Sequence, residues 1–413
     1  MSNPSHRLHV CIAGHIAGDD VRQYLHDGQG PVPGGYFGAP LMGVLIGALL
    51  AAGCRVTGVT TDATLPPDNA DIVLDGPDFR FVVVPCRRRA WRPNGWHLGR
   101  AVDVFAMERR RLRSAIARAD ADIVHAHWSY EFALAAIGQR APNLITCHDS
   151  PGAVLRHMRN AYRGIRYLMA MRVFKSGQRF TAVSKYLAEQ IQPYIAGPVA
   201  VVPNPLSAEA FRLGRARQRS SSRRIAIVCN GWGVLKNPQP AMEAFAAWRS
   251  IESAAELHLF GVGFEAGGLA NAWARKQGID QAMVFHGVKR HEELLAALST
   301  MDALVHPALE ESFGVVIAEA MALGLPVVAG RHSGAVPWVL GGEDESMTAG
   351  VLVDVRDPAG VYKGLERVFG PEYEAFSSCG AQQAKARFSA EAVAAAYLEI
   401  YRHCLADERY APA

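Results

Sequence analysis

The residues whose types and spacing could do chemistry are Glu311 and Glu319, which stand eight positions apart around Gly314. Gly314 permits a tight turn, and the apolar run from Val315 predicts a helix whose first turn carries free N–H groups and the positive end of the helix dipole. Such a helix end can bind an anion, for example a diphosphate. Glu319 lies one turn further along, where a carboxylate can hold vicinal hydroxyls, and Glu311 precedes the turn. The alternative is that both glutamates are solvated charges beside a buried helix.

Short apolar segments alternate with longer helical patterns along the chain, and these elements must position the glutamates. Apolar strands separated by helices predict parallel sheets with helices on both faces, which bind ligands at the carboxyl ends of the strands. The expected strands are 8–13, 55–60, 81–84, 123–125, 144–147, 180–183 and 199–202 in the first half, and 224–228, 256–260, 284–286, 303–306, 327–329 and 350–353 in the second.

A chain of 413 residues exceeds the usual size of one core and predicts two domains. The strand–helix pattern restarts after Pro205 and a polar tract rich in arginine and serine at 212–223, which we interpret as the interdomain linker. We therefore expect an α/β protein with two doubly wound, Rossmann-like domains, 1–205 and 206–389, that face a central cleft.

The block from His306 to Val328 resembles the donor site of the retaining glycosyltransferases of family 4, which have the two-domain GT-B fold. The family pattern is Glu-x7-Glu, with Phe-Gly after the first Glu and Glu-Ala-x-Ala-x-Gly-x-Pro-Val-Val at the second, and this block matches it nearly completely. The resemblance implies a nucleotide-diphosphate sugar as co-substrate, with UDP or GDP expected, and no other cofactor. It places the ribose on Glu319 and the sugar beside Glu311. The diphosphate would lie on Phe313, Gly314, Val315 and Lys236.

Weaker landmarks of the family occur in the first half. The paired glycines Gly34 and Gly35 permit close backbone approach to a phosphate, and in the family this loop caps the donor diphosphate. A plain turn would use the same residues. His127 ends an Asp-x-x-His-x-His motif at a strand end, so the resemblance places it in the cleft near the transferred sugar. His125 is expected to be buried support, and His148 ends the next strand at the same rim as an acceptor-side candidate.

The resemblance also assigns roles to the two domains. It implies that the first domain binds the acceptor and that the second binds the nucleotide sugar. It further implies that a final helix at about 390–405 crosses back to cover the first domain. The segment 14–31 is longer than a usual strand-to-helix loop and is a further acceptor-contact candidate.

The second half departs from the family pattern before Lys236. The family has Gly-Arg five or six residues upstream, and the two basic side chains grip the diphosphate. Here Gly231 or its neighbour stands at the arginine position. We favour replacement of the arginine by backbone N–H groups of the turn from Gly231 to Gly233. The alternatives are that Arg331 reaches in or that the enzyme is weakened, and Trp232 either stacks on a ligand or packs.

Two further positions bear on the donor. Gly261 belongs to a Gly-x-Gly turn that ends the next strand, where the family approaches the nucleotide. Pro337 stands where the family usually has a glutamate, which leaves the sugar unassigned.

Arg156, Arg159, Arg163 and Arg166 follow i, i+3, i+7, i+10 spacing and predict one basic helix face. A solvated face and a surface for an anionic membrane or a lipid-pyrophosphate acceptor are both open interpretations. Residues 1–205 carry 23 Lys+Arg against 15 Asp+Glu, a net charge of +8, whereas residues 206–413 carry 20 against 24, a net charge of −4. Any attraction to anionic partners therefore belongs to the first half.

Composition limits the remaining function classes. The seven cysteines are scattered without a Cys-x-x-Cys pair, and no Asp-x-Asp or His/Cys cluster has metal-ligand spacing, so we expect reduced thiols and no metal. The longest apolar segment, 41–52, is shorter than the ~20 residues that cross a bilayer, and the first residues lack a signal core. We expect a cytoplasmic protein, at most peripheral at the inner face of the cell membrane, with no nucleic-acid partner.

The resemblance predicts a metal-independent, retaining hexosyl-type glycosyltransferase with His127, Glu311 and Lys236 as its catalytic residues. Its acceptor would be a glycan or a glycolipid. Only seven of the 43 basic residues are lysine, a bias that favours a GC-rich genome and a bacterial polysaccharide or glycoconjugate pathway. The alternatives are a nucleotide-sugar epimerase of the same fold and a non-catalytic nucleotide-sugar binder, the latter because of the missing arginine.

Overall fold

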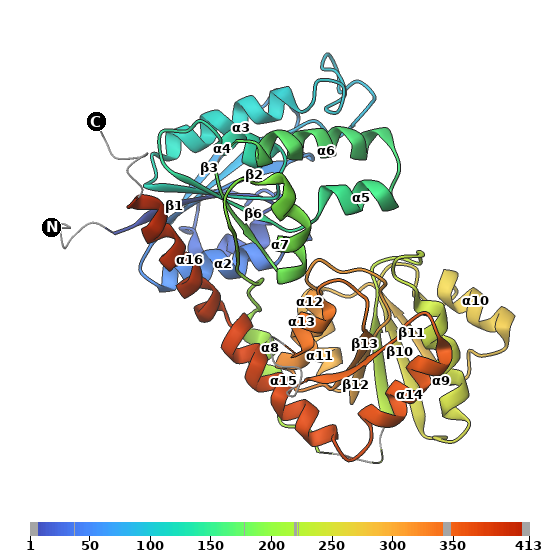
Figure 1. Ribbon diagram of the computed structural model, residues 1–413. Helices are drawn as coiled ribbons and strands as arrows, with labels where there is room; N and C mark the ends of the chain where they lie inside the picture. Colours follow the sequence, from blue (N-terminus) through green and yellow to red (C-terminus); the bar gives the residue numbers. More distant parts are fainter. Residues whose placement is uncertain are drawn as a thin grey trace. The chain divides into compact units, whose positions relative to one another are not determined.

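The computed structural model describes residues 7–36, 38–176, 178–218, 221, 223–341 and 348–406. The chain forms two compact units, of which the first comprises Met1–Pro205 with Ala390–Ala413 and the second comprises Leu206–Ser389 (Figure 1). Each unit is an α/β layer structure built on its own sheet. The predicted α/β fold class is thereby confirmed.

The first unit is built on an eight-stranded sheet in the order β3-β4-β2-β1-β5-β6-β7-β8. Its pairs are parallel except that β3 is antiparallel to β4. The strands are β1 (His9–Ala13), β2 (Arg55–Asp62), β3 (Ile72–Asp75), β4 (Phe79–Pro85), β5 (Ile123–His127), β6 (Asn143–Cys147), β7 (Arg179–Ala182) and β8 (Val199–Val201). The sequence did not predict β3, since it is a four-residue edge strand with only one buried residue.

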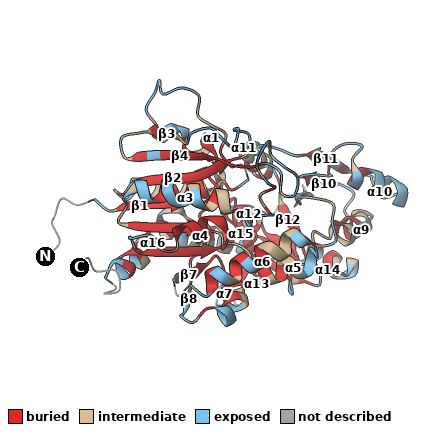
Figure 2. Ribbon diagram, turned by 90° about the horizontal axis from the view of Figure 1, so that it is seen from above, coloured by how far each residue is buried: buried red, intermediate tan, exposed pale blue. Residues whose placement is uncertain are grey.

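Helices cover both faces of this sheet, and the central strands are buried along nearly their whole length (Figure 2). The regular helices are α1 (Gly18–Val21), α2 (Leu41–Ala51), α3 (Ala106–Ala119), α4 (Glu131–Ala136), α5 (Pro151–His157), α6 (Ala161–Phe174), α7 (Lys185–Ile191) and α16 (Ala390–Leu405). Two short 3-10 helices, η1 (Arg22–Tyr24) and η2 (Gln192–Tyr194), complete the unit. The last helix, α16, packs beside α2 through Val393, Tyr397 and Tyr401 in one apolar cluster with β1 and β2.

The second unit has a six-stranded parallel sheet in the order β11-β10-β9-β12-β13-β14. The strands are β9 (Arg223–Val228), β10 (Ala255–Phe260), β11 (Met283–Gly287), β12 (Ala303–His306), β13 (Val327–Gly330) and β14 (Gly350–Val353). The helices are α8 (Ala208–Leu213), α9 (Pro238–Arg249), α10 (Leu269–Gln277), α11 (His291–Leu298), α12 (Val315–Ala322), α13 (Val336–Gly341), α14 (Pro358–Val368) and α15 (Tyr373–Phe388). The buried Trp248 stacks on Phe369 and anchors the core on one face of the sheet.

The interpretation of 212–223 as the interdomain linker is wrong for the described part of that tract. The chain crosses between the units at Pro205 and Leu206, so α8 already belongs to the second unit. Arg217 is buried there, and its guanidinium donates to the carbonyl oxygens of Ser299, Met301 and Leu323. A polar composition hid this role because a buried arginine is indistinguishable from a solvated one in sequence. Residues 219, 220 and 222 of the tract lie outside the described residues.

Candidate functional sites at the carboxyl edges of the two sheets

In the second unit, the candidate residues gather where β9 and β12 end. These neighbouring strands mark the point at which the strand order reverses, and doubly wound sheets bind ligands at such a point. The loop after β9 carries Lys236, and the loop after β12 carries Glu311. The backbone N–H of Leu309 donates to the carbonyl oxygen of Leu235 at 2.8 Å, which joins the two loops.

Lys236 and Glu311 form an ion pair, with 2.6 Å between Nζ and Oε1. His306 lies beneath this pair, and its Nε2 is 3.4 Å from the same oxygen of Glu311. Burial would raise the pKa of Glu311, but His306 and Lys236 outweigh it and lower that pKa to about 2. Glu311 is therefore an anion at every physiological pH, and Lys236 is held in place rather than free in solvent.

Helix α12 begins beside this pair. Its N-cap, Gly314, has a φ of 86°, which is in the left-handed region that favours glycine. Because glycine has no side-chain acceptor, the N–H groups of Val315 and Val316 donate no hydrogen bond within the described residues. Phe313 is buried against Phe388, with 5.4 Å between ring centroids, so its side chain anchors the turn. A role for Phe313 in donor binding stays a prediction.

Glu319 is buried, and its carboxylate already has a partner. The Nε2 of His291, the first residue of α11, lies 2.6 Å from Oε1 of Glu319. The sequence predicted Glu319 as a ligand for ribose hydroxyls but did not identify His291. The position of His291 at a helix start after a strand was the available signal.

Three glycines were predicted to contact the donor in the loops after β9 and β10, and they differ in whether and why the structure requires glycine there. Gly261 approaches the Cys229 carbonyl so closely that a Cβ would lie 1.9 Å from it, which is a packing requirement. Gly231 has a φ of 114° but open space around it, and Gly233 has neither restriction. The N–H groups from Gly231 to Gly233 donate no hydrogen bond within the described residues. The guanidinium of Arg331 donates to the Leu352 carbonyl, so in this structure it does not replace the missing arginine.

Trp232 packs within the unit. Its ring centroid is 5.9 Å from that of Phe264 and 5.6 Å from that of Trp273. The packing alternative is thus the one that the structure shows.

In the first unit, four histidines and two large aromatic rings stack at the carboxyl ends of β1, β5 and β6. His15 lies between Tyr36 and Trp128, with centroid distances of 3.7 Å and 4.2 Å. Trp128 also stacks on His148, and its φ of 63° places a bulky residue in the left-handed region. Such a conformation costs on the order of 1–3 kcal/mol and occurs mainly at functional sites.

His127 and His148 share a hydrogen bond, with 2.9 Å between Nδ1 of His127 and Nε2 of His148. Burial lowers the pKa of His127 well below its usual value and lowers that of His148 to about 3, so both rings are neutral. One neutral ring must then donate to the other. If His148 donates, Nε2 of His127 carries a proton and can donate to a ligand, and that atom has no partner among the described residues.

His125 is fully buried and fixes this strand to the last helix. Its Nδ1 lies 2.7 Å from the hydroxyl of Tyr401, and its Nε2 lies 2.7 Å from Oγ1 of Thr146. Thr146 in turn contacts Thr181. The helix at 390–405 therefore contributes a polar contact to the strand that carries His127, which the sequence did not predict.

Of the paired glycines before α2, Gly35 is explained by packing. The N–H of Gly35 donates to Oδ2 of Asp62 at 2.9 Å, and a Cβ at Gly35 would lie 2.4 Å from the Ile16 carbonyl. The Gly34 carbonyl accepts from the N–H of Gly18. A phosphate contact at this loop stays a prediction.

The predicted basic helix face is wrong. Arg156 lies in α5, Arg159 lies between the helices, and Asn160 caps a separate helix, α6, that carries Arg163 and Arg166. Arg166 is buried, with 2.6 Å between its Nη1 and Oε2 of Glu131. The spacing of the arginines did not reveal the break, although Asn160, a preferred N-cap residue, was the available signal. Arg156 and Arg159 line a surface pocket of about 460 Å³ with Tyr167 and Tyr194.

Two features are absent from the described residues. No group of three or more His, Cys, Asp and Glu side chains there could hold a metal ion. No helix in that part of the chain has both the length and the apolar character needed to cross a bilayer.

Comparisons with known proteins agree with this architecture. The family model described as "Glycosyltransferase Family 4" matches residues 42–210, and the one described as "Glycosyl transferases group 1" matches residues 222–370. The D-inositol 3-phosphate glycosyltransferase of Acidothermus cellulolyticus is 30% identical over 230 residues, which cover 52% of this chain and 50% of that protein. The glycogen synthase of Mycobacterium tuberculosis is 27% identical over 303 residues, which cover 70% of each chain.

Among solved structures, the sucrose-phosphate synthase from Thermosynechococcus elongatus superposes with a TM-score of 0.71 at 18% identity, covering 97% of this chain and all of that one. The match to the inositol phosphate enzyme spans half of that protein's length. Two Rossmann-like units with polar residues at the strand-order reversal define a GT-B protein. The chain belongs to glycosyltransferase family 4.

Proposed function

We propose that this protein is a retaining glycosyltransferase that moves a sugar from a nucleotide-diphosphate sugar to a hydroxyl group of a glycan or glycolipid acceptor. The observation that carries the proposal is the arrangement at the edge of the second unit. A lysine held by Glu311 accompanies a glycine-capped helix end and a turn whose N–H groups donate no hydrogen bond within the described residues. The lysine, the helix N-terminus and the turn are three kinds of hydrogen-bond donor that could bind one diphosphate.

The nucleotide-sugar donor would bind mainly through its negatively charged diphosphate. Lys236 and the amides of Val315 and Val316 would take the diphosphate oxygens, and the turn at Gly231 would supply the N–H groups that replace the family's arginine. Glu319, oriented by His291, would accept from ribose hydroxyls. UDP and GDP are the proposed nucleotides, and no metal is needed in this scheme because lysine and amides neutralise the leaving group.

In the proposed reaction, the bond between the anomeric carbon and the diphosphate oxygen breaks while the acceptor oxygen forms a bond on the same face of the sugar. The acceptor proton passes to the departing diphosphate. Lys236 lowers the barrier by stabilising charge that develops on the leaving group, and His127 donates a neutral hydrogen bond to the sugar or acceptor. The first unit would bind the acceptor, with His148 as a positioning residue for His127. The bacterial polysaccharide or glycolipid role and the cytoplasmic location are part of the same proposal.

The test begins with thermal unfolding of the full chain with UDP-, GDP- and ADP-sugars. A ligand at about 100 times its dissociation constant stabilises by roughly 2.7 kcal/mol. Lys236→Met should abolish the shift, whereas Arg331→Met, which removes an exposed cation that donates to the Leu352 carbonyl, should keep it. NMR of the product then reads the anomeric configuration.

The same assays separate the alternatives. An epimerase would convert the donor without an acceptor, and a binder would show the thermal shift without turnover. If no nucleotide sugar shifts the unfolding midpoint, or if Arg331→Met and Lys236→Met behave alike, the proposed donor site is wrong.

A further inference from the structure

The loop between β4 and α3, residues 86–105, presents exposed apolar and basic side chains together. From Arg88 to Arg100 it contains four arginines and no acidic residue. Trp96 is fully exposed at 100%, and Leu98 is 58% exposed. The other exposed members are Arg88, Arg89, Trp91, Arg92, Val102 and Val104. A side chain as large as Trp96 is rarely left wholly in water without a partner.

The loop places Trp96 at the tip of a tight turn. Asn94 and His97 exchange backbone hydrogen bonds of 2.9 Å and 3.2 Å, so Gly95 and Trp96 are the two turn residues. Gly95 has a φ of 62°, which favours glycine at that position. The turn is tied further along by His97, whose Nε2 lies 2.6 Å from Oδ1 of Asp68. The indole is therefore displayed outward by a defined backbone.

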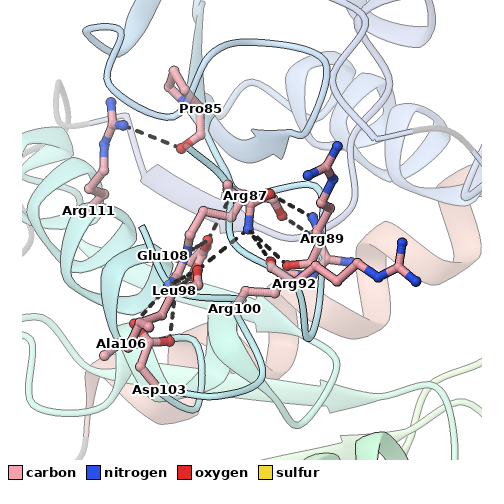
Figure 3. A network of polar contacts seen from close by, with 11 residues as sticks. Pro85, Arg87, Arg89, Arg92, Leu98, Arg100, Asp103, Ala106, Glu108 and Arg111 are labelled. Atoms are coloured by element: carbon pink, nitrogen blue, oxygen red, sulfur yellow. Dashed lines mark hydrogen bonds and ion pairs between the residues drawn. The ribbon is translucent and has the colours of Figure 1, made fainter. Parts of the chain in front are cut away.

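A buried ion network holds both ends of the loop (Figure 3). Arg87 is buried, and its guanidinium donates to Asp103 at 2.8 Å and to Glu108 at 2.5 Å. The same group donates to the Leu98 carbonyl, and Arg100 donates back to the Arg87 carbonyl. In Figure 3 the guanidinium of Arg92, by contrast, points away from the network. The acidic side chains at the base of the loop, Asp103 and Glu108, are thus paired with the buried Arg87.

Backbone strain adds a second observation. Val104 and Phe105 have φ values of 54° and 60°. A β-branched residue in the left-handed region is a genuine outlier, and such strain persists only where surrounding contacts impose it. Here Phe105 is buried and lies 6.2 Å from the ring of Tyr162, while Val104 stays exposed. The chain thus keeps an aliphatic residue at the surface at an energetic cost.

We propose that loop 86–105 is a membrane-docking element that inserts Trp96 and its apolar neighbours into the interface of an anionic lipid bilayer. Tryptophan and aliphatic side chains enter the headgroup boundary, and arginines around them bind anionic lipids. The exposed aliphatic residues favour a bilayer over a nucleic acid, because they offer no stacking surface to a base. This assignment does not rest on the proposed transfer reaction, and it replaces the basic helix face as the membrane contact.

The experiment is sedimentation of the full chain with vesicles of phosphatidylcholine alone and of phosphatidylcholine mixed with phosphatidylglycerol. We expect binding to the anionic vesicles, weakened by added salt. Arg88→Gln with Arg92→Gln should weaken binding by about tenfold, and Trp96→Ser should do the same. Controls in the second unit are Arg212→Gln with Arg275→Gln and Leu269→Ser, which also remove exposed basic and apolar groups and should leave binding unchanged.

A second measurement reads insertion directly. Brominated lipids quench tryptophan that enters the bilayer, and Trp91→Phe with Trp96→Phe should remove most of that quenching in a protein that still binds. Because both indoles are exposed, the variants should keep the unfolding midpoint of the parent. The proposal is overturned if the loop variants bind like the parent, if neutral vesicles bind as well as anionic ones, or if RNA is bound in preference to vesicles.

Discussion

The carboxyl edges of the two sheets both lie at a reversal of the strand order, but the side chains there differ in chemistry. The edge of the first unit holds neutral, stacked rings in which His15 and His125 have pKa values lowered to about 3 by burial. The edge of the second unit holds a partly buried ion pair, a glycine-capped helix, and N–H groups that donate no hydrogen bond within the described residues. The first arrangement can recognise hydroxyl groups by shape and neutral hydrogen bonds. The second attracts anions.

The largest expected effect tests the charged edge. Lys236→Met should lower kcat/KM for the cognate nucleotide sugar by about 100-fold to 1,000-fold, because one preorganised charge on the leaving group is worth roughly 3–4 kcal/mol. Steady-state kinetics with Arg331→Met as control measures it. A loss of less than threefold would mean that the edge does not hold the leaving group.

The neutral edge should be sensitive to acid. A buried histidine whose pKa is lowered in the fold contributes stability that is complete above the unfolded pKa of 6.5 and is lost as pH falls toward 3. At one unit below 6.5, each such histidine costs about 1.4 kcal/mol. Hydrogen exchange should therefore show amides of β5 and β6 opening between pH 6.5 and 5.5.

Amides of β12 provide the internal control for that experiment. The pKa of Glu311 is lowered to about 2, so its stability contribution is present above the usual value of 4.5 and is lost only in stronger acid. Equal acid sensitivity of both edges would contradict the contrast between them.

An effect of similar size concerns the support of the neutral edge. Tyr401→Phe removes the hydroxyl that contacts His125 and leaves a buried imidazole nitrogen unpaired, which should cost about 1–3 kcal/mol of the free energy of unfolding. Chemical denaturation measures this loss. Tyr397→Phe, whose hydroxyl makes a longer contact of 3.2 Å with Thr146, should cost less. The reverse order would show that the contact of Tyr401 with His125 is not the stronger of the two polar contacts.

The smallest effect sharpens the role of the open amides. Gly231→Ala forces an alanine to adopt a φ of 114° or to move the turn, so donor affinity should fall by about tenfold. Gly233→Ala has open space and no such φ, and it should change affinity by less than about twofold. Calorimetric titration compares the two. Equal effects would argue against an amide nest at this turn.

The exposed loop before α3 contrasts with both edges, because it projects apolar side chains into solvent. In sequence, Arg87, Arg88 and Arg89 are equivalent members of one basic run. Only the fold separates them: Arg87 is buried between Asp103 and Glu108, while Arg88 and Arg89 remain at the surface. The same ambiguity misled the interpretation of Arg156 to Arg166, where one arginine of four is buried.

Local pattern determined much of this protein. Apolar runs specified the central strands, such as β1, β5 and β6, because both faces of a parallel sheet are buried there, and Gly314 before an apolar run specified a helix start. The family and its GT-B fold followed from residues that are adjacent in sequence, such as Glu311 to Glu319.

Only the tertiary structure decided which side chains meet. Lys236 and Glu311 are 75 residues apart, and His125 and Tyr401 are 276 apart, so no local pattern encodes their contacts. His291 was missed for the same reason, because its partner Glu319 lies on another element. The burial, charge state and partners of a side chain depend on the order of the strands and on where helices such as α16 pack. Both are set by the packing of the whole unit and not by any one segment.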